Sequence, residues 1–234
     1  FEAGDRFELE GETPEHGRIT ASDVVPSPAI IRDVKAKNVN PDTDDYYTRL
    51  SVTIADPAGE KNYYAIRLIR IEYYLNRWWE WNREEQKEYF KEEIISHEEE
   101  YWREFRKDEI LFGNIDGTPT GIRRWSQFSD ELIDGCEYTL TLRLDKTGPN
   151  RRNPETMPPG QWQGSLVVGQ DFRVEILTLS PGLFQYLRSV ELAQHQSSSF
   201  SEPVQIYSNV TGGYGILGAY NVASATVSPE NILP

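Results

Sequence analysis

Residues 46–74 read YYTRLSVTIADPAGEKNYYAIRLIRIEYY, and their pattern is typical of β-structure. Leu50, Val52 and Ile54 alternate with polar residues, which is the period of two of a half-buried strand. The polar segment 56–62, which contains Pro and Gly, follows as a turn, and a second run rich in Tyr and Ile comes after it. Two such runs joined by a short turn predict a β-hairpin.

The same alternation recurs later in the chain. It is visible in CEYTLTLRLD (136–145) and in DFRVEILTLS (171–180), where Phe172, Val174 and Ile176 share one face. Ser180 followed by Pro181 is typical of the start of a helix, and SPGLFQYLRSVELAQHQ then has one apolar face. The sequence therefore predicts a mainly β fold, sandwich-like, with one helix in its C-terminal half.

A different pattern occupies residues 83–106, which contain neither Gly nor Pro. Phe90, Ile94, Tyr101 and Phe105 fall at helical spacing. We predict one long amphipathic helix or two shorter ones, an insertion at about 80–110 whose apolar residues Phe90, Ile94 and Phe105 face the sheet. The expected organisation is thus residues 1–28 as the tail of a preceding β-domain and its connector, and residues 29–234 as the main β-domain.

Charge and motifs exclude several functions. The net charge of −14 argues against nucleic acid as a partner. Cys136 is the single cysteine, which excludes an internal disulfide and a Cys-based zinc site, and the three His residues (His16, His97 and His195) are scattered. No nucleophile elbow, phosphate-binding loop or dinucleotide fingerprint is present. We therefore expect no catalytic residues, no cofactor and no metal.

The densest aromatic cluster is RWWEW, which contains Trp78, Trp79 and Trp81 and follows Tyr73 and Tyr74. Exposed Trp rings stack on sugars or anchor protein partners. The same rings could instead pack the insertion against the sheet. These five aromatic residues are the candidate binding residues, and the pattern alone leaves both roles open.

The last distinctive stretch is IYSNVTGGYGILGAYNVAS (206–224), with Gly at 212, 213, 215 and 218. No helix signal follows the glycines, which argues against a phosphate cradle at a helix N-terminus. We predict that residues 212–215 form a turn between two paired strands, with at least one positive φ.

Several of these motifs together resemble the DUF4249 family. LSPGLFQYLRSVELAQHQ followed by FSEPVQIYSNVTGGYGILGAY is similar to its C-terminal signature. Three upstream segments agree in order, namely AGDRFELE with ITASDVVPSPAI, SVTIADPAGEKNYYAIRL, and FSDELIDGCEYTLTLRL. Within the signature, the resemblance gives a structural turn made by Asn209, Gly212, Gly213, Tyr214 and Gly215.

The resemblance implies a lipid-anchored protein on the surface of the Bacteroidetes outer membrane, and the function that we favour is non-enzymatic. Family members look like accessory proteins of TonB-dependent nutrient receptors, so a receptor of this kind is the expected partner, with a peptide or glycan as ligand. The chain begins with Phe1 and its single Met is Met157. The resemblance implies that a secretion signal, a lipidated Cys and most of an N-terminal β-domain precede it. The alternatives are an adhesion or structural protein of the cell envelope and, third, a glycan-active enzyme.

Overall fold

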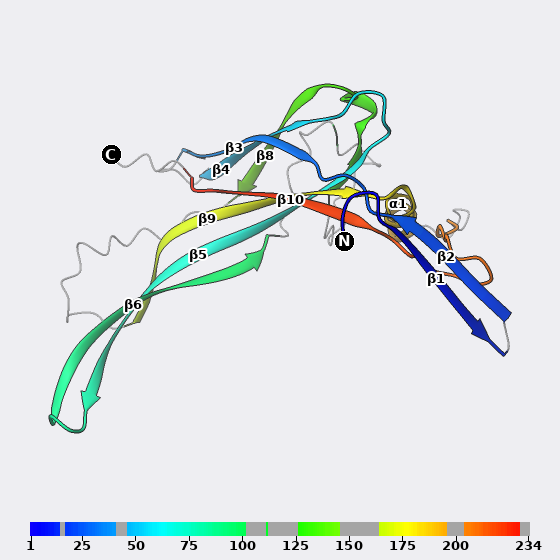
Figure 1. Cartoon of the computed structure of the whole chain (residues 1–234). Coiled ribbons are helices and arrows are strands. Elements are labelled where there is room, and N and C mark those ends of the chain that lie inside the picture. The colour runs from blue at the N-terminus through cyan, green and yellow to red at the C-terminus, as the bar shows by residue number, and fades with distance from the viewer. Residues whose placement is uncertain are drawn as a thin grey trace.

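The computed structural model describes residues 1–14, 17–40, 46–101, 111, 126–145, 164–195 and 204–229. In these residues the fold is mainly β with one α-helix, and two of its sheets enclose a common core as in a sandwich (Figure 1). The predicted fold class is therefore confirmed. No helix in the described part of the chain is long and apolar enough to cross a membrane.

Three sheets make up the described part of the fold. The elements are β1 (Arg6–Thr13), β2 (Gly17–Val24), β3 (Ile30–Val39), β4 (Tyr47–Ala55), β5 (Tyr63–Asn82), β6 (Lys87–Glu100), β7 (Ser126–Ser129), β8 (Glu137–Asp145), β9 (Gly164–Leu179), α1 (Pro181–His195) and β10 (Tyr220–Val227). The strand orders are β1-β2, β3-β4-β8 and β10-β9-β5-β6, and β7 also pairs with β5. All pairings are antiparallel.

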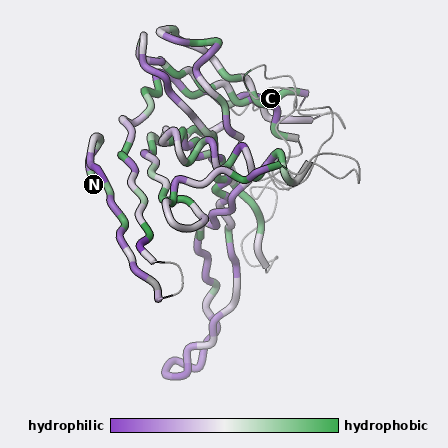
Figure 2. The backbone as a smooth tube through the Cα atoms, turned by 90° about the vertical axis from the view of Figure 1, so that its right-hand side faces the viewer, coloured by the Kyte–Doolittle hydropathy of each residue, from purple (hydrophilic) through white to green (hydrophobic). Residues whose placement is uncertain are grey.

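The core lies between the second and third of these sheets. Leu50 and Val52 of β4 lie opposite Leu142 and Leu140 of β8, and all four are fully buried. Side chains of β5 and β9 meet them from the other sheet, among them Ile66, Leu68, Phe172, Val174 and Ile176. The alternation read from the sequence therefore correctly predicts the buried faces of β4, β8 and β9. Figure 2 shows hydrophobic residues concentrated in the sandwich that these two sheets form, which we call the body.

The hairpin predicted for residues 46–74 is wrong. Its two strands, β4 and β5, form correctly but belong to different sheets, so segment 56–62 passes from one layer to the other. The buried hydroxyl of Tyr64 donates to Asp56 Oδ1 at 2.6 Å, and Gly135 N donates to Asp56 Oδ2 at 3.1 Å. Burial raises the pKa of Tyr64 far above its ordinary value. These bonds hold the crossing in place.

The helix predicted for residues 83–106 is also wrong, and with it the helical insertion at about 80–110. Residues 87–100 form strand β6, which pairs with β5 from Ile69↔Glu100 to Asn82↔Lys87. Ile94, expected to face the sheet, is 62% exposed. Phe105 lies outside the described residues. Pairing with a long neighbouring strand overrode the helical spacing, because the aromatic and β-branched side chains here suit a strand.

Helix α1 begins as predicted. The Ser180 hydroxyl accepts a hydrogen bond from Leu183 N at 3.3 Å, and Pro181 is the first helical residue. Its Phe184 stacks on Tyr63 with the ring centroids 4.3 Å apart. The helix thus covers the opposite face of β5 and β9, where Phe184 packs with the buried side chains Ala65, Leu177 and Leu179.

The glycine stretch is a loop rather than a hairpin. The prediction of positive φ is confirmed at Gly212 (+82°) and Gly215 (+138°). The prediction that this turn joins two paired strands is wrong, because β10 pairs with β9 and Thr211 forms an isolated bridge with Thr20 of β2. Asn209 closes the loop, since its Nδ2 donates to Leu217 O at 2.8 Å and its Oδ1 accepts from Leu217 N at 3.0 Å.

Residues next to this loop hold the β1–β2 hairpin against the body. Asp23 Oδ2 accepts hydrogen bonds from the Ser180 hydroxyl and from Ala219 N, the latter at 2.7 Å. Asn221 Nδ2 donates to Pro26 O at 3.2 Å. The hairpin, the start of α1 and the segment before β10 are therefore joined at one carboxylate. The domain division after residue 28 stays a prediction.

Replacing Gly212 with Val should lower the free energy of unfolding by about 1–3 kcal/mol, because an L side chain is strained at its φ. A Cβ there would also overlap the carbonyl oxygen of Arg18. Gly59→Val is the matched control, since Gly59 has a φ of +79° but open space around its Cβ position. Urea unfolding should show the larger loss for Gly212→Val. Equal losses would contradict the close approach to Arg18.

Candidate functional site on the β5–β6 arm

Strands β5 and β6, with the first part of β9, extend away from the sandwich and end at a free turn (Figure 1). We call residues 73–96 and 164–169 the arm. Pairing between β5 and β9 ends at Arg77↔Gly164, whereas β5 and β6 remain paired as far as Asn82↔Lys87. Residues 78–91 are therefore a two-stranded tip.

The turn of the tip is built by its own side chains. Asn82 Oδ1 accepts hydrogen bonds from Glu84 N at 2.9 Å and Glu85 N at 3.3 Å, and Gln86 has a φ of +51°. An Asn whose side chain bonds to backbone amides two and three residues later is a common way to reverse a chain. Asn82 after an aromatic strand is the signal that could have predicted this turn.

The three Trp residues all lie on the tip and are exposed by 38% (Trp78), 41% (Trp79) and 55% (Trp81). Because side chains alternate along a strand, Trp79 and Trp81 share one face and Trp78 lies on the other. Trp79 makes an edge contact with Phe90 of β6, with the ring centroids 5.4 Å apart. The structure thus places the Trp residues together at the tip but divides them between its two faces.

Tyr73 and Tyr74 lie nearer the body, and their hydroxyls are already bonded. Tyr73 donates to Asp171 Oδ2 at 2.8 Å, and Tyr74 donates to Glu72 Oε2 at 2.6 Å. These hydrogen bonds to carboxylates raise the pKa of both tyrosines. Ser228 donates to the other oxygen of Asp171 at 2.6 Å. Tyr73 therefore connects β5 to β9 at the base of the arm, whereas the hydrogen bond of Tyr74 stays within β5.

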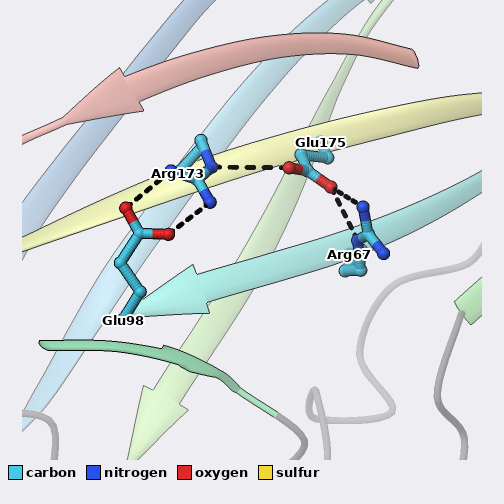
Figure 3. Close-up of polar contacts among 4 residues, drawn as sticks. All are labelled: Arg67, Glu98, Arg173 and Glu175. Atoms are coloured by element: carbon cyan, nitrogen blue, oxygen red, sulfur yellow. Dashed lines mark hydrogen bonds and ion pairs between the residues drawn. The ribbon is translucent and has the colours of Figure 1, made fainter. Parts of the chain in front are cut away.

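Ion pairs brace the base of the arm on one face of the sheet (Figure 3). Arg173 of β9 reaches across β5 and donates from Nη1 and Nη2 to the two carboxylate oxygens of Glu98, at 2.9 and 2.6 Å. Its Nε lies 3.4 Å from Glu175 Oε1, and Glu175 also pairs with Arg67. Bidentate contacts of this kind fix geometry as well as charge.

A second set of ion pairs braces the opposite face. Arg70 Nη2 donates to Glu99 Oε2 at 2.6 Å, and Arg70 Nη1 lies 3.5 Å from Glu72 Oε1. β6 is thus held to its neighbours from both faces at its C-terminal end. The base of the arm is therefore fixed more firmly than the tip, where Lys91 and Glu80 make a longer contact of 3.8 Å.

The remaining predicted residues lie elsewhere. His97 is exposed on β6 opposite Glu72, His195 ends α1, and His16 is outside the described residues. Among the described residues, no group of three metal-ligating side chains comes together. Of the family-motif residues, Asn209, Gly212, Gly213 and Gly215 belong to the loop beside β2, and Tyr214 projects from it with 98% of its surface exposed.

A pocket of about 310 Å³ lies between the β1–β2 hairpin and the segment before β10. Phe1, Phe7, Val25 and Tyr220 contribute apolar surface, and Asp23 contributes a carboxylate. Sequence reasoning missed Asp23, because one Asp near the end of a strand carries no pattern. The Asp23 oxygen that bonds Ser180 and Ala219 is already committed to the fold.

A family model described as "Domain of unknown function (DUF4249)" matches residues 1–226. The chain belongs to this family, as the C-terminal motifs predicted. A comparison with curated proteins finds no match.

Replacing Arg173 with Gln should raise the pKa of Glu98, because the hydrogen bonds from Arg173 hold that pKa below its ordinary value. A carboxyl group whose pKa is lower in the folded state stabilises the fold at a pH above its unfolded-state pKa. This stabilisation is lost as the pH falls through the folded-state pKa. As the pH falls between these two pKa values, the free energy of unfolding should therefore decrease less in the variant than in the unchanged chain. NMR titration of the Glu98 carboxyl carbon measures the change. Arg6→Gln, in the distant β1 strand, should leave Glu98 unaffected, and an unchanged Glu98 pKa in Arg173→Gln would contradict the pairing.

Proposed function

We propose that this protein is a non-enzymatic binding component of the cell envelope that docks onto a protein partner through the tip of its arm. One observation carries the proposal, namely the exposure of three Trp residues at the end of a projecting β-ribbon. Trp is enriched among the residues that contribute most to protein interfaces. Leaving three of them in water is costly for a surface that has no partner.

The shape of the arm favours a protein partner over a small ligand. Small ligands are usually bound in concave sites, whereas the Trp residues belong to the two-stranded end of a ribbon that projects from the sandwich (Figure 1). A convex aromatic surface needs a partner that supplies the concave side. Charged residues surround the rings, including Glu80, Glu88 and Lys91, and such a polar rim is typical of protein interfaces.

The partner we propose is an outer-membrane TonB-dependent receptor, with this protein displayed at the cell surface by a lipid anchor. Support comes from the resemblance of the chain's motifs to lipoproteins that accompany such receptors, together with membership of the DUF4249 family. In this arrangement the sandwich is a rigid base that presents the arm to the receptor.

The test is to replace Trp78, Trp79 and Trp81 with Ala in the full-length protein and to purify it from native membranes. We expect at least about a ten-fold loss of the co-purifying receptor, because the aromatic anchors are removed. The melting temperature should change little, since all three rings are partly exposed and lie outside the two buried core clusters.

Tyr214→Ala is the matched control, because it removes an exposed aromatic ring from a different loop. It should leave co-purification unchanged. A folded triple variant that retains its partner would rule out the tip as the docking surface. Collapse of the fold in that variant would show that the rings serve packing.

A further inference from the structure

We propose that the free edge of β6 accepts an added β-strand from a basic, extended segment of the partner protein. This inference rests on the proposed function and deepens it, because it specifies the chemistry of the partner. The added strand would pair along the edge of the arm, whereas the docking proposed above uses the Trp residues at its tip.

The first support is the position of β6 in its sheet. β6 lies at the end of the order β10-β9-β5-β6, and within the described residues it pairs with β5 only. It is a 14-residue strand, and along residues 87–99 no other described strand pairs with its second edge. Proteins usually shorten, bend or cover such edges, because an open row of N–H and C=O groups is a template for another strand.

The second support is the exposure of apolar side chains on both faces of β6. Ile94 is 62% exposed and lies opposite Leu75, whereas Ile95 is 44% exposed on the other face, opposite Tyr74. A partner that covered one face of the sheet would leave the other isoleucine in water. A strand added beside β6 would place its alternating side chains against both.

The third support is charge, which selects among possible strands. Residues 70–100 contain ten Glu and five Lys and Arg, and β6 itself contains six Glu and two Lys. Pairing the edges of two copies would bring like charges together, which disfavours a second copy of this chain. A segment rich in Lys or Arg would be attracted instead. The occupant is therefore a basic strand.

The experiment titrates this chain with a short synthetic peptide of alternating Lys and Val. We expect the peptide to bind and to slow hydrogen exchange of amides along β6. The same peptide with its backbone amides methylated keeps the charge but cannot pair as a strand, so it should bind at least about ten-fold more weakly. Absence of binding, equal binding of the methylated peptide, or unprotected β6 amides would each overturn the proposal.

Variants of the chain locate the effect. Glu88→Lys with Glu93→Lys reverses two exposed charges on β6 and should weaken peptide binding about ten-fold. Glu12→Lys with Glu60→Lys makes the same change in net charge away from the arm and should have little effect. Equal weakening by both pairs would show a general charge effect and would overturn the edge as the site.

The triple Trp variant separates this inference from the proposed function. It should bind the Lys–Val peptide normally, because its β6 edge is intact. If the folded triple variant loses the peptide, the peptide binds the tip and the edge proposal fails. If it keeps both the peptide and the receptor, the edge proposal holds and the Trp-dependent docking fails.

Discussion

The continuous antiparallel pairing of β5 is the constraint on which the rest of the structure depends. This strand of 20 residues pairs with β9 along one edge, and with β7 and then β6 along the other. Its first half supplies Ile66 and Leu68 to the core, and its second half forms the middle of the arm. Body and arm are therefore one sheet, and the position of the tip follows from the packing of the core.

Side-chain alternation was sufficient to predict β4, β8 and β9, because a face buried against another sheet demands a strict period of two, but it did not predict β3 or β7. This is why the buried faces of β4, β8 and β9 could be read from the sequence. Pairing partners are set by non-local contacts, so the crossing at residues 56–62 looked like a hairpin. The buried bond between Asp56 and Tyr64, which holds that crossing, leaves no periodic trace in the sequence.

The arm was harder to predict for a related reason. β6 has no deeply buried face, so its pattern follows no strict alternation, and four apolar residues happened to fall at helical spacing. The Trp residues were found as a cluster by composition alone, although their division between two faces needed the register of β5 and β6. Similarly, the glycine stretch predicted a positive φ correctly, whereas its neighbour β2 lies almost two hundred residues earlier in the chain.

The continuity of β5 also has a mechanical consequence. A partner that pulls on the tip along the strand direction loads the backbone hydrogen bonds between β5 and β9 in shear, so many of them must break together. The same force applied across the strands would open those bonds one after another. A protein built in this way resists tension along its arm far better than it resists peeling, and the direction of approach of any partner bound at the tip would decide how long the two remain attached.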